Sequence, residues 1–109
     1  MNESAPLCRL DDIADGGAIA VQVDSATGGF ELIVLRQGER VFAYHNECPH
    51  AGRRLDYAPG QFLVSDGRVV CAAHGATFRV DNGACLGGPC SNGLVPMPVR
   101  VVDREIRLR

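Results

Sequence analysis

The sequence FELIVLRQGERVFAYH, residues 30–45, carries the clearest structural signal in this chain. It consists of two runs rich in apolar residues, Phe30 to Arg36 and Arg40 to His45, joined by Gln37-Gly38-Glu39. Apolar residues such as Leu32 and Val34 recur at every second position, which is the period of a β-strand. The pattern predicts a β-hairpin whose second strand leads directly toward Cys48.

The rest of the chain repeats this pattern of short apolar runs separated by Gly, Asn and Asp. Further strands are expected at residues 7–10, 18–23, 62–64, 69–71, 77–80, 84–86, 95–102 and 105–108, with one helical turn at 11–15. Pro96 and Pro98 should lie on a sheet edge or at a bulge, because proline has no N–H to donate. No long helical period, internal repeat or low-complexity segment is visible. The sequence therefore predicts a single all-β domain over residues 1–109, an antiparallel β-sandwich or open barrel.

Composition excludes several classes of function. The formal net charge is −2, and the eleven basic residues are all arginines spread along the chain, which argues against a nucleic-acid-binding stripe. No apolar run approaches the roughly 18 residues of a membrane span, so no membrane association is expected. The first ten residues lack the basic start and apolar centre of a secretory signal, and a cytoplasmic location is therefore expected. In such a reducing compartment, the five cysteines favour metal ligands or thiols over disulfides.

Two short segments, Cys48-Pro49-His50 and Cys71-Ala72-Ala73-His74, each offer one thiol and one imidazole. We call them the first and the second clip. Each clip follows a strand of a predicted hairpin, so two loops should face one another at one end of the domain. Zn²⁺ accepts two Cys and two His ligands, but zinc fingers place the two Cys in one segment and the two His in another. The mixed spacing favours a [2Fe–2S] cluster with two thiolates on one iron and two imidazoles on the other.

With its clips, the chain resembles the Rieske iron–sulfur family. The resemblance extends over most of the chain, from about Phe30 to Leu108. Beyond the clips it includes Ala51-Gly52, the stretch Gly75 to Phe78, Asn82-Gly83 and Gly87-Gly88-Pro89. It implies one [2Fe–2S] cluster held by the four ligands Cys48, His50, Cys71 and His74, within a cluster-binding part at about residues 46–90. It also implies a subdomain of two ligand loops, with Gly87-Gly88-Pro89 forming a third loop that covers the cluster. The connection around Tyr57 to Gln61 is a few residues longer than in most small members.

The resemblance also implies a low reduction potential. High-potential members carry a disulfide between the clip loops, at positions where this chain has Arg53 and Ala73. They also carry Ser and Tyr hydroxyls that bond to sulfur, at positions where this chain has Ala76 and Phe78. Hydrogen bonds to the sulfurs raise the potential, so their loss predicts a value near the low end of the Rieske range, about −150 to +300 mV. This is the pattern of the ferredoxin type.

Several other residues have a plain and a functional interpretation. His45 is expected to be a strand-end histidine and not a spare ligand, and Cys8 a half-buried strand residue. Cys85 and Cys90 flank Gly87-Gly88-Pro89; packed free thiols are the favoured interpretation, and the alternatives are that they pair with each other or sense oxidants near the cluster. Arg53 and Arg54 follow the first clip and either orient an acidic redox partner or form a solvated loop.

These features favour an electron carrier without a substrate site of its own. The resemblance implies a ferredoxin component that passes single electrons from a reductase to an oxygenase. One alternative is a redox-sensing or structural module, with the cluster or zinc used for folding. Another is a small subunit of a larger reductase. The sequence does not indicate the oligomeric state, the partners or the pathway.

Overall fold

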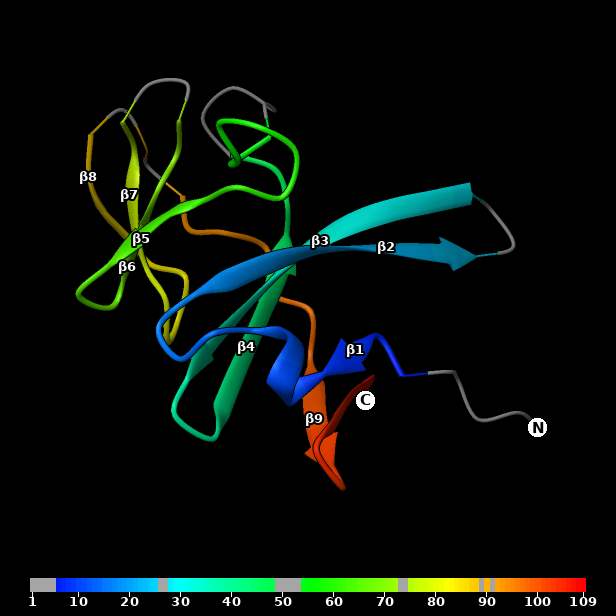
Figure 1. Ribbon diagram of the computed structural model, residues 1–109. Coiled ribbons are helices and arrows are strands. Elements are labelled where there is room, and N and C mark those ends of the chain that lie inside the picture. The colour runs from blue at the N-terminus through cyan, green and yellow to red at the C-terminus, as the bar shows by residue number, and fades with distance from the viewer. Residues whose placement is uncertain (1–5, 26–27, 49–53, 73–74, 89, 91) are drawn as a thin grey trace.

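The chain folds into short antiparallel strands in a computed structural model that describes residues 6–25, 28–48, 54–72, 75–88, 90 and 92–109. Three sheets are present in that part of the chain, with strand orders β1-β10-β9, β2-β3-β4 and β5-β6-β7-β8 (Figure 1). The strands are β1 (Cys8–Arg9), β2 (Ala18–Ser25), β3 (Gly28–Gln37), β4 (Arg40–His45), β5 (Leu63–Ser65), β6 (Arg68–Val70), β7 (Thr77–Arg79), β8 (Cys85–Gly87), β9 (Val99–Val102) and β10 (Glu105–Leu108). A 3₁₀ turn, η1 (Leu10–Asp12), follows β1.

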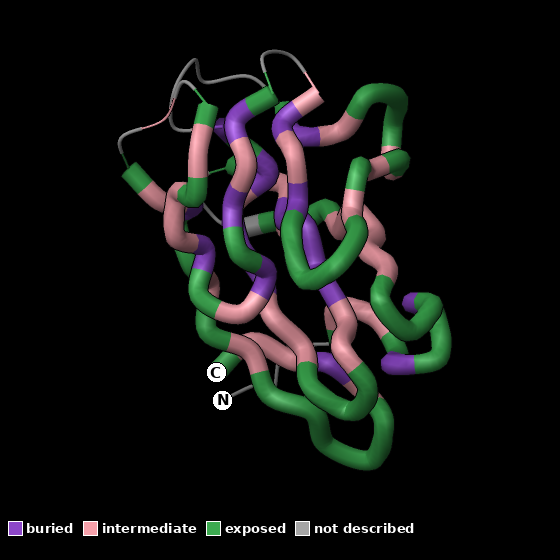
Figure 2. Tube along the Cα trace, turned by 90° about the vertical axis from the view of Figure 1, so that its left-hand side faces the viewer, coloured by how far each residue is buried: buried purple, intermediate pink, exposed green. Residues whose placement is uncertain are grey.

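Strand β3 lies at the centre of the molecule and is buried on both faces. The side chains of residues 32–35, in the middle of this strand, have no exposed surface. Ile33 and Leu35 belong to one hydrophobic cluster, while Leu32 and Val34 belong to a second cluster on the opposite face. Figure 2 shows the buried positions running along the strands and the exposed positions at the turns. The central sheet therefore separates two hydrophobic cores, one on each of its faces.

One of these cores packs against the β1-β10-β9 sheet, which closes the base of the molecule. Leu32 and Val34 meet Ile13 and Ile106 there. A segment before β9 runs along the edge of β4: the His45 N–H donates to the Val95 carbonyl at 2.9 Å, and the Met97 N–H donates to the Ala43 carbonyl at 2.9 Å. Pro96 and Pro98 alternate with Val95 and Met97, the residues that bond to β4, and so lie at the sheet edge, as predicted. The prolines also shorten the expected strand 95–102, which begins only at Val99.

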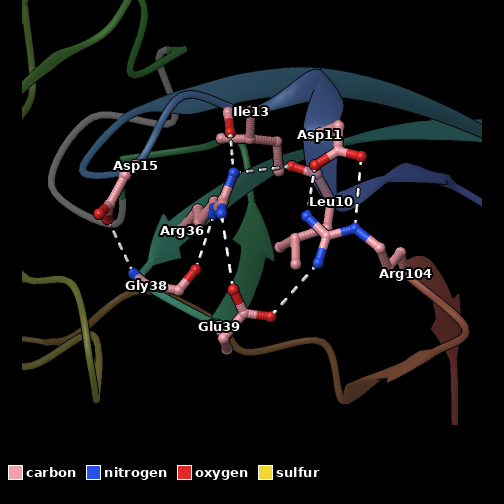
Figure 3. Close-up of polar contacts among 8 residues, drawn as sticks. All are labelled: Leu10, Asp11, Ile13, Asp15, Arg36, Gly38, Glu39 and Arg104. Atoms are coloured by element: carbon pink, nitrogen blue, oxygen red, sulfur yellow. Dashed lines mark hydrogen bonds and ion pairs between the residues drawn. The ribbon is translucent and has the colours of Figure 1, made fainter.

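A group of polar contacts fastens the base to the turn between β3 and β4 (Figure 3). Arg36 donates to the carbonyls of Leu10 at 3.3 Å, Ile13 at 2.9 Å and Gly38 at 2.7 Å. Arg104 pairs with both Asp11 and Glu39. Because β4 runs from this turn toward Cys48, the contacts lie at the end of the hairpin away from the clips and serve the fold.

The second core joins β3 and β4 to the β5–β8 sheet. Ile33 and Leu35 share it with Val69 and Phe78. Tyr44 on β4 crosses this boundary, and its buried hydroxyl donates to the Val80 carbonyl at 2.7 Å. Burial raises the pKa of Tyr44 to about 12, so the hydroxyl stays a donor at neutral pH. Gly83 lies flat against the Tyr44 ring, since a Cβ at this position would lie 2.7 Å from Cε1.

The predicted all-β antiparallel architecture is confirmed, and the described strands form open sheets and no closed barrel. Both hairpins expected to lead into the clips are present, β3-β4 and β5-β6. The helical turn expected at 11–15 is shorter and lies at Leu10–Asp12. The alternation assigned to residues 30–36 was incomplete, because Ile33 and Leu35 are as deeply buried as Leu32 and Val34.

Replacing Tyr44 with Phe removes the hydroxyl and leaves the Val80 carbonyl without this donor. We expect the Tyr44→Phe change to lower the free energy of unfolding by about 1–2 kcal/mol. Chemical denaturation followed by circular dichroism measures this value. Tyr57, which is 58% exposed, provides the matched control, and Tyr57→Phe should change the stability little. Equal losses for the two variants would contradict the bridging role of Tyr44.

Candidate metal centre

The two clip cysteines both enter one hydrophobic core. Cys71 directly follows β6, and Cys48 follows the end of β4 by three residues. Both side chains are buried and belong to the core cluster that also contains Leu55, Ala76 and Phe78. The two predicted imidazole ligands, His50 and His74, lie outside the described residues. The structure thus places the two predicted thiols in one buried cluster.

The second clip is carried by a closed turn between β6 and β7. The Cys71 N–H donates to the Ala76 carbonyl at 2.7 Å, and the Gly75 N–H donates to the Cys71 carbonyl at 2.9 Å. Gly75 has a φ of 78°, a left-handed conformation that glycine adopts without strain. Val70 and Thr77 are paired in register immediately outside this turn. The backbone of Cys71 is therefore fixed by its own hairpin.

The first clip is held at its base by Asn46, a buried polar residue that the sequence analysis did not select. Its side-chain oxygen accepts the Leu55 N–H at 2.9 Å, and its side-chain nitrogen donates to Glu31 Oε1 at 2.9 Å. The Asn46 N–H also donates to the Glu31 carbonyl at 2.9 Å. These bonds bring the two ends of segment 46–55 together and attach them to β3. The signal was an Asn at a strand end, a residue whose side chain commonly bonds backbone groups in turns.

Arg54 adds an ion-pair network to this base. It lies 2.5 Å from Glu31 and makes two bonds to Asp56, at 2.7 and 3.0 Å. The Arg54 guanidinium holds the pKa of the Asp56 carboxyl below its ordinary value of 3.8, and the Gly60 N–H acts in the same direction. Asp56 therefore stabilises the fold above that pH, and this stabilisation is lost as the pH falls through the lowered pKa. The charge of Arg54 is balanced within the chain, which favours the structural interpretation of this residue; Arg53 lies outside the described residues.

The first and second clips are linked to each other through the backbone. The Ala72 N–H donates to the carbonyl of Leu55 at 3.3 Å, so a residue of the second clip bonds to the residue that closes the first. The predicted covering loop also reaches this point. A Cβ on Gly88 would lie 2.8 Å from the Gly75 carbonyl oxygen and 2.9 Å from Ala76 Cα. The hairpin of the second clip therefore contacts both segment 46–55 and the covering loop.

The remaining sequence predictions have mixed outcomes. His45 ends β4 and its ring lies 5.2 Å from that of Phe30, as expected for a strand-end histidine. Cys8 lies in β1 and is half-buried, as predicted, and burial raises its pKa to about 11. The packed-thiol interpretation of Cys85 and Cys90 was wrong, and the alternative that they pair is confirmed, because these residues form a disulfide. The turn through Gly88 brings their Cα atoms to 6.1 Å, which a spacing of five residues does not reveal.

The surroundings of the thiols fit an iron–sulfur cluster. Within the described part of the chain, no three His, Cys, Asp or Glu side chains gather to hold a metal ion, so this test rests on Cys48 and Cys71. Both thiols belong to a cluster of apolar side chains in which Ala76 and Phe78 are fully buried. Thiolates are the ligands that iron–sulfur clusters take, and an apolar shell limits solvent access. Zinc also accepts thiolates, so the distinction comes from relatives.

Comparison with known proteins identifies the family. The model of the Rieske [2Fe-2S] domain matches residues 3–101. The chain is 27% identical to the anthranilate 1,2-dioxygenase ferredoxin subunit of Burkholderia cepacia, with 94% of this chain and 88% of that protein covered. It is 29% identical to the ferredoxin component of the alkene monooxygenase system of Xanthobacter autotrophicus, over 91% of this chain and 75% of the relative.

A solved structure supports the same assignment. The ferredoxin of carbazole 1,9a-dioxygenase from Nocardioides aromaticivorans superimposes with a TM-score of 0.75 at 28% identity, over 98% of this chain and 97% of that one. The chain belongs to the Rieske [2Fe-2S] domain family. Its cofactor is therefore a Rieske-type [2Fe-2S] cluster, and the relatives named here are ferredoxins, which are electron carriers.

Removing the Asn46 side chain should loosen the first clip. The Asn46→Ala change leaves the buried Leu55 N–H without its acceptor, and we expect it to lower the free energy of unfolding by about 1–3 kcal/mol. The same change should lower the iron content of the purified protein, measured by a colorimetric iron assay.

Asn82→Ala is the matched control for this prediction. The Asn82 side chain also accepts a backbone N–H, that of Ala84 at 2.9 Å, but in an exposed turn away from the clips. Its loss should leave the iron content unchanged. An Asn46→Ala protein with full iron content and unchanged stability would contradict the anchoring role.

Proposed function

We propose that this chain is a ferredoxin that carries one electron at a time from a reductase to an oxygenase. The supporting observation is the burial of Cys48 and Cys71 in one core cluster, in a member of the Rieske family. In this proposal Cys48 and Cys71 hold one iron of the cluster, and His50 and His74 hold the other. The cluster supplies reversible one-electron chemistry, and the residues around it set its potential and exposure.

The structure supports a low potential for this site. Ala76 and Phe78, which stand where high-potential relatives place hydroxyls, are buried, and their side chains carry no donor. Between them, Thr77 has a hydroxyl, but it donates to the Gly75 carbonyl at 3.2 Å. With few side-chain donors available to the sulfurs, the reduced state gains little from hydrogen bonding. A low potential suits a carrier that delivers electrons onward to an oxygenase.

Partners and surroundings complete the proposal. The relatives are named as components of dioxygenase and monooxygenase systems, which supports a reductase as donor and an oxygenase as acceptor. Transient electron-transfer contacts of this kind are small.

In the described part of the chain, no helix has the length and apolar character needed to cross a bilayer. We place the protein in the cytoplasm, a reducing compartment in which Cys48 and Cys71 stay reduced and available to iron. We assign residues 1–109 to one domain, with the cluster-binding part at about 46–90.

A redox-sensing module is the second candidate, and the Cys85–Cys90 disulfide is the observation that favours it. A sensor changes its state in response to oxidants but need not pass electrons rapidly to a second protein. The two candidates therefore differ in how quickly the reduced protein is reoxidised by an oxygenase.

Spectroscopy and redox titration test the carrier proposal. We expect a brown-red protein that shows a rhombic EPR signal of low average g after reduction and a midpoint potential below zero. Cys71→Ser should abolish the colour and the signal, whereas Cys8→Ser should preserve both, because Cys8 lies in the other core cluster. A midpoint clearly above zero would contradict the assigned type, and a colourless protein with one zinc would contradict the cluster.

The carrier and the sensor are separated by rapid mixing. The reduced protein is mixed without oxygen with the oxidised oxygenase encoded nearest to this chain, and the visible spectrum is followed. Reoxidation at least as fast as the turnover of the oxygenase supports the carrier. Reoxidation much slower than turnover, with an intact cluster, favours the sensor.

A further inference from the structure

The Cys85–Cys90 disulfide closes a short ring at the edge of the cluster-binding sheet. Cys85 begins β8 and is paired with Phe78 of β7. The chain then turns through Gly87 and Gly88, and the Cys90 N–H donates to the Gly88 carbonyl at 2.8 Å. None of the four predicted cluster ligands lies in this ring.

The ring holds a residue, Gly88, that packs against Gly75 and Ala76, directly after the second clip. A Cβ on Gly88 would come within 2.8 Å of the Gly75 carbonyl oxygen, and Gly88 has a φ of 79°. At the neighbouring Gly87, a Cβ would meet nothing within 4 Å. Gly75 in turn bonds to the Cys71 carbonyl. Backbone contacts therefore connect the disulfide ring to a predicted cluster ligand.

The two residues of the disulfide lie at the boundary between the core and the surface. Cys85 and Cys90 are only partly buried, and they pack against the core cluster that contains Cys48 and Cys71. A ring this short constrains the unfolded chain less than a long one, so its main effect is local. In a reducing compartment, disulfides of mesophilic proteins are usually transient and catalytic or redox-sensing.

We propose that Cys85 and Cys90 form a reversible thiol–disulfide site that controls how firmly Gly88 is held against Gly75 and Ala76, the residues that follow the second clip. Its reaction partner is a dithiol, either a protein or a small molecule. One thiolate of the dithiol attacks a sulfur of the disulfide and forms a mixed disulfide, and its second thiol then resolves this bond. The cysteine pair gains two electrons and two protons, and the dithiol leaves as its own disulfide.

The closed disulfide keeps Gly88 against residues 75 and 76 and slows the loss of iron. The open dithiol releases this constraint and lets iron leave sooner. This consequence rests on the proposed cluster, whereas the exchange reaction itself does not.

Redox buffers of reduced and oxidised dithiothreitol test the proposal on the intact protein under anaerobic conditions. The state of the pair is read by alkylation and mass spectrometry, and iron release to a chelator is followed by absorbance. We expect the pair to open and close reversibly with the buffer ratio, and the closed form to release iron several-fold more slowly. The double variant Cys85→Ser/Cys90→Ser should release iron at the rate of the open form in every buffer, and Cys8→Ser should respond as the unaltered protein does.

Three results would overturn the proposal: a pair that stays closed in excess reduced dithiothreitol, a pair that stays open in excess oxidised dithiothreitol, or equal iron release from both forms. A protein that contains no iron in either form would count against the proposed function. Alkylation would still decide the exchange reaction in that case, so the two failures are distinguishable.

Discussion

The burial of β3 on both faces is the constraint on which the rest of the structure depends. Its residues 32–35 supply side chains to two cores at once. One core seats the base sheet, and the other seats the sheet that carries the second clip. Burying four large apolar side chains contributes roughly 6–12 kcal/mol before chain entropy is counted. Because β3 is fixed in this way, it positions both the base sheet and the sheet that carries the second clip.

The site uses this fixed strand through a few polar side chains at its edges. Glu31 on β3 bonds Asn46, and Asn46 closes the base of the first clip. Tyr44 on the neighbouring strand bonds Val80 in the sheet that carries the second clip. The cluster ligands thus come from loops, but each loop begins at a group tied to the central sheet. Rigid surroundings suit electron transfer, because the redox site then needs little rearrangement between its two states.

Much of this structure could be predicted from the sequence, because its signals are local. The period of residues 30–45, the turn residues and the spacing of the two clips indicated an all-β fold and a two-iron site. The second buried face of β3 was missed because a continuous apolar run such as Leu32 to Leu35 carries no periodic signal to separate its two faces. Asn46 and the Cys85–Cys90 disulfide depend on how loops return in space, which spacing alone does not specify. The assignment of His50 and His74 as ligands stays a prediction.

The most direct test of the central claim is the nitrogen hyperfine spectrum of the reduced protein, recorded by pulsed EPR with and without ¹⁵N-labelled histidine. We expect couplings from two histidine nitrogens, which change with the label and which persist in a His45→Gln variant, because His45 packs on Phe30. A paramagnetic cluster without histidine coupling would show that His50 and His74 are not the ligands, and loss of one coupling in His45→Gln would show that His45 is one of them.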